Sequence, residues 1–112
     1  MERDFLPNLK QVMELYVLHK QCDLDTISEV IDLSSRTLQR RLSKLGTSFN
    51  QIQTEVKLDL ATRRLAGNTT PIHDIALELG YNDTPHFSRA FRNWTGMTPS
   101  QYRARKINPG PR

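Results

Sequence analysis

Apolar residues recur along most of this chain at intervals of three and four, the spacing that puts them on one face of an α-helix. Alternation with a period of two is scarce, and no Asn-Gly or Asp-Gly turn joins two β-branched runs. The pattern therefore predicts an all-α fold of about seven helices. Their starts are predicted after Pro7, at Asp25 or Thr26, at Ser34 or Ser35, at Ser48, at Thr70–Pro71, at Thr84–Pro85 and at Thr98–Pro99.

Each predicted helix carries an apolar stripe that we expect to be buried. Glycines stand where several stripes stop, which is typical of helix ends. These glycines are Gly46, Gly67, Gly80 and Gly96. The stripes of the first, second, third and sixth helices consist of Leu9, Val12, Met13, Tyr16 and Val17; of Ile27, Val30 and Ile31; of Leu38, Leu42 and Leu45; and of Phe87, Ala90, Phe91 and Trp94.

The second and third predicted helices recur as the fifth and sixth, at an offset of 48 to 50 residues. The matched positions are Ile27 with Ile75, Leu38 with Phe87, Leu42 with Phe91, and Gly46 with Gly96. A hydroxyl three residues before a glutamine follows each copy, in GTSFNQI at 46–52 and in GMTPSQY at 96–102. Each copy is a short helix, a tight turn and a second helix, which defines a helix-turn-helix unit.

The fourth predicted helix, from Ser48 to about Ala66, carries two apolar stripes rather than one. They consist of Ile52, Val56 and Leu60, and of Leu58, Ala61 and Leu65. Because a helix against a single core needs one stripe, we expect this helix to bridge two small lobes. The predicted organisation is a first helix-turn-helix lobe at 1–47, a linker helix at 48–67, a second helix-turn-helix lobe at 68–106 and a disordered tail at 107–112.

The charge distribution suggests a polyanionic partner, although a basic, solvated helical face would give the same net charge. The chain carries +4 at pH 7 and has a pI of about 9.6. Residues 1–33 hold three Lys/Arg and seven Asp/Glu, a net −4; residues 34–67 hold seven and two, a net +5; residues 68–112 hold six and three, a net +3. An acidic first third thus precedes a basic remainder.

In each repeat, the second helix has an outward face of hydrogen-bonding side chains, which we predict to contact double-stranded DNA. The major groove of B-DNA admits one α-helix, and the first helix of the pair braces the second across the backbone. Arginine can pair with guanine, glutamine with adenine, and threonine with a thymine methyl group. The predicted recognition helices cover about 35–45 and 85–95. The candidate DNA-binding residues are Ser35, Arg36, Thr37, Gln39, Arg40, Ser43, Thr84, His86, Ser88, Arg89 and Arg92.

The sequence gives little support to a membrane protein, a secreted protein, a metal-binding protein or an enzyme. No apolar run approaches the roughly 20 residues of a membrane span, and there is no signal-peptide pattern. The only cysteine, Cys22, excludes an intrachain disulfide and favours the reducing cytoplasm. It lies three residues after His19, but structural zinc usually takes about four ligands. Ser88 lies close to His86 without a base oriented by a third group, so we expect no catalytic residue, no metal and no cofactor.

Two segments resemble a known family. IALELGYNDTPHFSRAFRNWTGMTPSQYR at 75–103 closely resembles the signature of AraC/XylS-type bacterial transcription regulators. SSRTLQRRLSKLGTSFNQIQTEVKLDLATRRLA at 34–66 resembles the first helix-turn-helix and linker helix of the same family, so the match covers about 24–105. The residues at the family's spacing in the second half are Ile75, Ala76, Gly80, Tyr81, Phe87, Arg89, Phe91, Gly96, Pro99, Tyr102 and Arg103.

The resemblance implies two helix-turn-helix lobes on successive major-groove segments of one DNA face, in the cytoplasm with the nucleoid. The linker helix of about 17 to 19 residues would measure roughly 25–29 Å, against about 34 Å between adjacent segments. RNA polymerase is a further partner by resemblance alone, and the effector-sensing or dimerising domain that the family usually adds is not visible here. The positions that match usual DNA contacts are Arg36, Gln39, Arg40, Thr84, His86 and Arg89.

The first lobe departs from the family pattern at two positions. Ser28 replaces a small alanine, and Asp32 replaces a turn glycine. Aspartate tolerates left-handed backbone better than most residues, so we expect the turn to survive. In the second lobe, Pro85 replaces a residue that could have made a polar contact.

A helical protein-interaction module with an acidic partner is the alternative function, but such a module does not need two groove-sized helices. Trp94 and the phenylalanines of its stripe are expected in the core. Arg41 lies beside a buried stripe and is expected to cover the core with its stem. For Arg63 and Arg64, phosphate contact and simple solvation are equally good readings.

Overall fold

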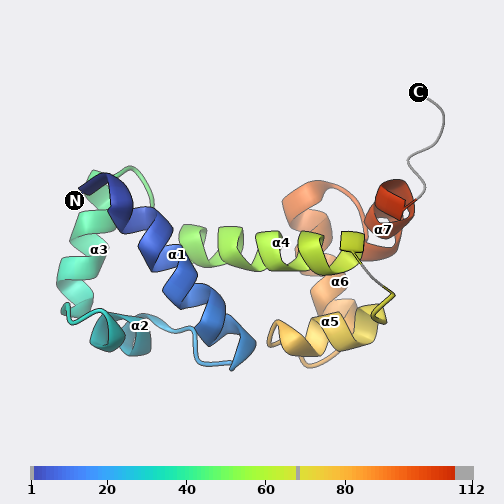
Figure 1. The fold of residues 1–112 in the computed structure, drawn as a ribbon, viewed down its shortest axis with the longest axis horizontal. Helices are drawn as coiled ribbons and strands as arrows, with labels where there is room; N and C mark the ends of the chain where they lie inside the picture. Colours follow the sequence, from blue (N-terminus) through green and yellow to red (C-terminus); the bar gives the residue numbers. More distant parts are fainter. Residues whose placement is uncertain (1, 68, 108–112) are drawn as a thin grey trace. The chain divides into compact units, whose positions relative to one another are not determined.

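The computed structural model describes residues 2–67 and 69–107 of the chain. Within these ranges it contains seven α-helices and no β-strand, which confirms the predicted all-α fold (Figure 1). The helices are α1 (Glu2–Leu18), α2 (Leu24–Val30), α3 (Ser35–Lys44), α4 (Phe49–Gly67), α5 (Ile72–Glu78), α6 (Thr84–Thr95) and α7 (Pro99–Ile107).

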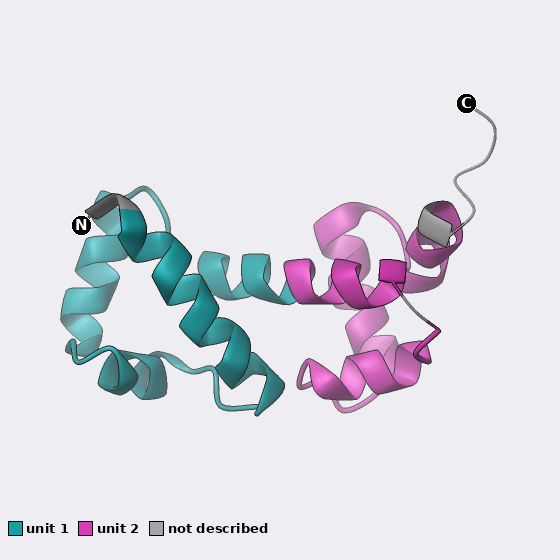
Figure 2. Ribbon diagram, in the orientation of Figure 1, with its two compact units in different colours: residues 1–57 teal, residues 58–112 magenta. Residues whose placement is uncertain are grey.

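The chain divides into two compact units, whose boundary falls inside α4 (Figure 2). Unit 1 comprises residues 1–57 and unit 2 comprises residues 58–112. The long helix α4 therefore contributes its first half to one unit and its second half to the other. This explains its two apolar stripes, because each half buries side chains in a different core.

The core of unit 1 is formed by apolar side chains from four helices. Most residues of the stripes predicted for α1, α3 and the first half of α4 are buried, whereas Val12, Tyr16 and Leu45 are half-buried. The buried apolar residues of this unit are Leu9, Met13, Val17, Ile27, Leu38, Leu42, Phe49, Ile52 and Val56. Packing of these side chains holds α2 against α1 and α3.

Helix α1 begins earlier than predicted, because Pro7 lies inside it rather than before it. Proline cannot donate the backbone hydrogen bond that an interior helical residue makes, which is why a start after Pro7 was expected. The extra turn contributes Phe5 to the packing of unit 1. The guanidinium carbon of Arg41 lies 4.9 Å from the centre of the Phe5 ring, an arrangement that favours a cation–π interaction.

Helix α2 is capped two or three residues earlier than predicted, since the sequence indicated a start at Asp25 or Thr26. The cap is Asp23, whose Oδ1 accepts a hydrogen bond of 2.8 Å from the backbone N–H of Thr26. This bond, and a second one from the Thr26 hydroxyl, lower the pKa of the Asp23 carboxyl from its ordinary value of 3.8. The prediction that Val30 points inward is wrong, because Val30 is 45% exposed at the end of this short helix.

The core of unit 2 is built around aromatic side chains of α6. Phe87 and Phe91 are completely buried, with their ring centres 5.8 Å apart. Tyr81 packs against Phe87 at 5.5 Å, and Tyr102 of α7 meets Phe91 edge-on at 5.6 Å. Burial raises the pKa of Tyr81 to about 12. The expectation that the aromatics of α6 form core is confirmed for Phe87 and Phe91, whereas Trp94 is half-buried beside Phe91.

Helix α7 begins with a capping box, formed by the hydroxyl and the glutamine three residues later that were noted in GMTPSQY. The Thr98 hydroxyl accepts from the backbone N–H of Gln101 at 3.1 Å, and the Gln101 amide oxygen accepts from the N–H of Thr98 at 2.9 Å. The helix runs to Ile107, so the predicted tail does not begin at 107. The remainder of that predicted tail, 108–112, lies outside the described residues.

Candidate nucleic-acid interface

The turn between the two helices of each repeat has the same backbone conformation in both units. Gly80 has a φ angle of 93°, and Asp32, which is 48 residues earlier, has a φ angle of 61°. Both values lie in the left-handed region, which glycine adopts readily and aspartate adopts more easily than most residues. The structure thus confirms that Asp32 preserves the turn. The turn ends each bracing helix, α2 or α5, shortly before its recognition helix, α3 or α6.

Helix α3 is held to unit 1 by one side and leaves the other side open. Its Ser34 cap accepts a hydrogen bond of 3.0 Å from the backbone N–H of Thr37, and Leu38 and Leu42 are completely buried. Arg41 is half-buried over Phe5, as expected for a side chain that covers the core. The remaining face carries Arg36, Gln39, Arg40 and Ser43, all exposed.

Helix α6 is held to unit 2 in the same way. Asp83 accepts a hydrogen bond of 2.8 Å from the backbone N–H of His86, so the cap lies one residue before the predicted Thr84–Pro85 start. The imidazole of His86 packs edge-on against Tyr81, with ring centres 5.3 Å apart. Phe87 anchors the inner side, while His86, Arg89 and Arg92 are exposed on the outer side.

The predicted DNA-binding residues form two groups, one on each recognition helix. Six of them lie on α3 and five on α6. Seven are exposed: Arg36, Gln39, Arg40, Ser43, His86, Arg89 and Arg92. Four are half-buried: Ser35, Thr37, Thr84 and Ser88. No side chain of either group belongs to the buried core.

Three of the half-buried hydroxyls already have partners within their own unit. The Thr37 hydroxyl accepts from Ser34 Oγ at 2.8 Å. Ser35 Oγ donates to Asp25 Oδ1 at 2.8 Å, and Thr84 Oγ1 lies 3.2 Å from His73 Nδ1. Asp25 was expected, with Thr26 as the alternative, to cap α2, and His73 was assigned no role. The repeat itself contains the missing signal, because these two residues occupy equivalent places in it.

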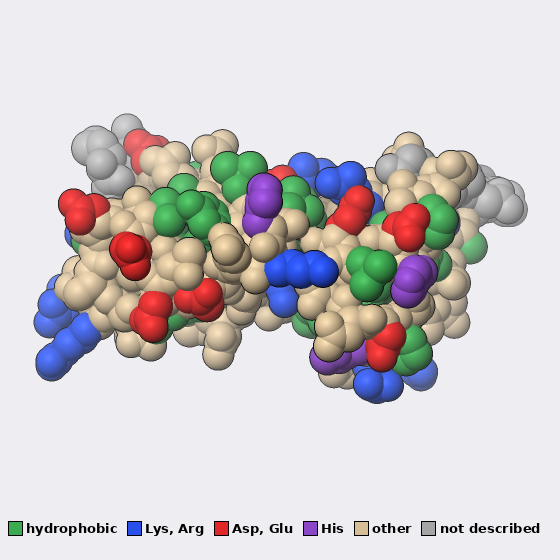
Figure 3. Space-filling model, turned by 90° about the horizontal axis from the view of Figure 1, so that it is seen from below, with side chains coloured by type: hydrophobic (Ala, Val, Ile, Leu, Met, Phe, Trp, Pro, Cys, Tyr) green, Lys and Arg blue, Asp and Glu red, His purple; other side chains and the backbone are tan. Residues whose placement is uncertain are grey.

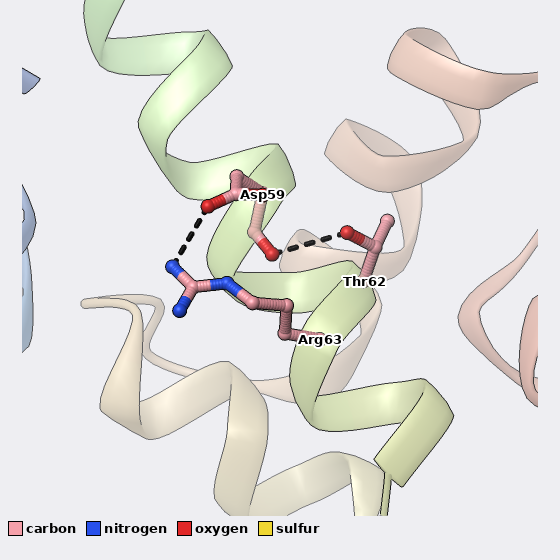
Figure 4. Close-up of polar contacts among 3 residues, drawn as sticks. All are labelled: Asp59, Thr62 and Arg63. Carbon is pink, nitrogen blue, oxygen red and sulfur yellow. Dashed lines mark hydrogen bonds and ion pairs between the residues drawn. The ribbon is translucent and has the colours of Figure 1, made fainter. Parts of the chain in front are cut away.

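The arginines of the two outer faces differ from those of α4. Arg36, Arg40, Arg89 and Arg92 form no ion pair with any residue whose side chain the structure describes. On α4, Nη2 of Arg63 lies 2.7 Å from Oδ2 of Asp59 (Figure 4), and Nε of Arg64 lies 3.7 Å from Oε1 of Glu78. For Arg63 and Arg64, the pairing favours solvated surface ion pairs.

Several acidic residues lie on and beside the bracing helix of unit 1. On the face drawn in Figure 3, carboxylates (red) lie over the part that belongs to this unit, and Lys/Arg side chains (blue) project at its edge. Helix α2 and its flanks carry four carboxylates and no basic residue: Asp23, Asp25, Glu29 and Asp32. The first recognition helix is thus accompanied by negative charge, whereas Asp74 and Glu78 are the only carboxylates on α5.

The residues considered for other chemistry do not assemble into a site. Among the described residues, no three His, Cys, Asp or Glu side chains lie where they could hold one metal ion. Burial raises the pKa of the Cys22 thiol to about 11, although Lys57 and Gln53 oppose the shift. None of the described helices has the length and apolarity that a membrane span requires.

The fold, the repeat and the outer faces define a helix-turn-helix domain, and comparisons with known proteins agree. The helix-turn-helix domain family matches residues 27–105. The ornithine utilization regulator of Pseudomonas aeruginosa is 44% identical over 81 residues, which are 72% of this chain and 24% of the regulator. The transcriptional regulator VirS of Mycobacterium tuberculosis is 38% identical over 84 residues, which are 75% of this chain and 25% of VirS.

Solved structures show the same fold. A transcriptional regulator of Chromobacterium violaceum with an AraC-type DNA-binding domain has a TM-score of 0.82 and 30% identity, covering 94% of each chain. The C-terminal domain of AraT, a response regulator from Geobacillus stearothermophilus, has a TM-score of 0.80 and 28% identity, covering 92% of this chain and 86% of that domain. The chain belongs to the AraC/XylS family of helix-turn-helix transcription regulators. It spans about a quarter of the length of the curated relatives reported above.

Proposed function

We propose that this chain is a sequence-specific, double-stranded DNA-binding domain of a bacterial transcription regulator. Its recognition helices α3 and α6 enter successive major-groove segments on one face of the DNA. The observation that carries this proposal is the pair of exposed arginine-bearing faces, each on a helix anchored by two fully buried side chains. Family membership supports the same function.

The chemistry of the outer faces suits base edges and phosphates. Arg40 on α3 and Arg89 on α6 each have a guanidinium group without an ion-pair partner among the described residues. Such a group can donate two hydrogen bonds to guanine O6 and N7, and Gln39 can pair with adenine N6 and N7. Thr37 is half-buried and bonded to its own cap, so it contributes less to readout than these three.

The alternative is a protein-interaction module that binds an acidic partner through the same basic faces. This alternative accounts for positive charge on α3 and α6 but gives no reason for two repeated helices that each follow a left-handed turn. We therefore prefer DNA to an acidic protein as the partner of α3 and α6. Contact with RNA polymerase and a cytoplasmic, nucleoid-associated location are parts of the same proposal.

Substitution of one arginine on each recognition helix tests the proposal. Arg40→Ala or Arg89→Ala should weaken binding to a selected DNA site by about 1–3 kcal/mol and relax base preference at one position. Arg63→Ala is the matched control, because Arg63 is paired with Asp59, and should leave base preference unchanged. Fluorescence anisotropy on single-base variants of the site measures both quantities.

The salt dependence of the same binding distinguishes DNA from a protein partner. The logarithm of the association constant should fall with the logarithm of salt concentration by roughly 0.9 for each phosphate that the chain neutralises. A chain that shows no preference among DNA sequences at any salt concentration would contradict sequence-specific binding.

A further inference from the structure

One contact occurs twice in this chain, once in each unit. The first residue of each recognition helix is a hydroxyl residue, Ser35 in α3 and Thr84 in α6. The second residue of each bracing helix is its partner, Asp25 in α2 and His73 in α5. Ser35 Oγ lies 2.8 Å from Asp25 Oδ1, and Thr84 Oγ1 lies 3.2 Å from His73 Nδ1. The partners are 48 residues apart and the hydroxyls 49, within the offset of the repeat.

The chemistry of the partner decides what each hydroxyl can offer to DNA. A hydroxyl has one hydrogen to donate and two lone pairs that accept, whereas an ionised carboxylate only accepts. Ser35 therefore gives its hydrogen to Asp25 and has only lone pairs left for another group. In the major groove, it can accept from the amino groups of adenine N6 or cytosine N4 but cannot donate to a phosphate, guanine O6 or thymine O4.

The partner in unit 2 does not impose the same direction. A neutral imidazole nitrogen either donates or accepts, depending on which nitrogen carries the hydrogen. When His73 Nδ1 donates, the hydrogen of Thr84 remains available for guanine O6 or thymine O4. The two equivalent hydroxyls are thus held in place by partners of different hydrogen-bonding character.

We propose that Asp25 and His73 are positioning residues, each of which adjusts base preference at one position through the direction of the hydrogen bonds that Ser35 or Thr84 can make. This inference rests on the proposed function, since it assumes that α3 and α6 read DNA. Neither Asp25 nor His73 needs to touch DNA, because each acts through the hydroxyl that it holds. Asp25 in addition brings a negative charge beside α3, which lowers the affinity of unit 1 for every DNA sequence.

The decisive comparison separates the hydrogen bond of Asp25 from its charge. Asp25→Ala removes both, so Ser35 regains a free hydrogen and base preference should change at one position, by roughly fivefold or more. Asp25→Asn removes the charge but keeps a carbonyl oxygen that accepts from Ser35, so the original preference should be retained. Glu29→Gln is the matched control, because Glu29 lies on the same helix and is exposed like Asp25. It should raise affinity slightly for all sequences and alter no preference.

The corresponding test in unit 2 uses His73→Ala, with His19→Ala as its control. His19 is also exposed, and its Nδ1 lies 2.7 Å from the backbone carbonyl oxygen of Leu15. Both residues belong to unit 1, and neither lies on α3 or α6. His73→Ala should change preference at one position, and should have no further effect in a Thr84→Val chain. His19→Ala should change nothing.

The measurement is the relative affinity for all four bases at every position of a site selected from random DNA. Changed preference in Asp25→Ala and His73→Ala, with retention in Asp25→Asn, supports the inference. Unchanged preference in these two alanine variants, in chains that still bind, overturns it and leaves the proposed function standing. A loss of preference in Asp25→Asn equal to that in Asp25→Ala also overturns it, because the charge would then be the cause. Failure of the unaltered chain to bind any DNA would overturn the proposed function itself.

Discussion

At the scale of single residues, Ser28 shows how the first repeat differs from the second. Ser28 is 3% exposed, and its hydroxyl has no hydrogen-bond partner among the described residues. The equivalent residue in the second repeat is Ala76, which is fully buried. An unpaired buried hydroxyl costs free energy because it has lost its bonds to water. The departure noted in the sequence at position 28 is therefore a source of instability in unit 1.

Replacing this residue with alanine should stabilise the chain. Ser28→Ala is expected to raise the free energy of unfolding by about 1 kcal/mol, measured by urea denaturation. Ser43→Ala on the exposed side of α3 is the control, because it changes helix propensity in the same way without removing a buried hydroxyl. A gain in Ser28→Ala no larger than that in Ser43→Ala would show that the buried hydroxyl costs nothing.

At the scale of helices, the start of α2 makes stability depend on pH. The hydrogen bonds from Thr26 lower the pKa of Asp23 in the folded chain, so the unfolded chain binds the proton more readily. The stabilisation of the folded chain by ionised Asp23 is therefore complete above the ordinary carboxyl pKa of 3.8. It is lost as the pH falls through the lower pKa that Asp23 has in the folded chain. Asp23→Asn keeps a cap but removes this dependence.

The loss of stability between pH 5 and pH 2 should consequently be smaller in Asp23→Asn than in the unaltered chain. Urea midpoints measured across this range provide the comparison. Glu29→Gln, at the other end of α2, should show the acid sensitivity of the unaltered chain. An identical loss in Asp23→Asn and the unaltered chain would mean that the cap contributes nothing to the acid response.

Sequence patterns predicted the start of a helix well where the hydrogen bonds that cap it join residues close together in the sequence. The caps at Ser34 and Ser48 and the capping box at Thr98 depend on residues three positions apart, so they can be read directly. The start of α1 could not be read in this way, because a turn that contains Pro7 gains from the contact of Phe5 with Arg41, 36 positions further along the chain.

The candidate interface was also predictable only in part: the exposed residues of α3 and α6 could be predicted, but not the partners of their hydroxyl groups. Helical periodicity separates the exposed arginines from the buried leucines and phenylalanines of α3 and α6. It cannot tell which hydroxyls are already occupied, because the partners of Ser35 and Thr84 lie ten and eleven residues away on another helix. The repeat aligns those partners, but their contact is seen only in the folded chain.

At the scale of the whole molecule, the chain is two similar units with unequal electrostatics. Each unit has a bracing helix, a left-handed turn and an anchored recognition helix. The carboxylates on and beside α2 oppose the arginines of α3, whereas unit 2 combines fewer carboxylates with Arg89 and Arg92 on α6. We expect unit 2 to supply the larger share of affinity and unit 1 to add specificity.

Hydroxyl-radical footprinting on a selected site tests the central claim, that both recognition helices read DNA. The account predicts two protected groove segments on one face of the duplex, centred about one helical turn apart. Arg40→Ala should weaken protection of one segment and Arg89→Ala protection of the other. Protection of a single segment, diminished by only one of the two substitutions, would contradict the account.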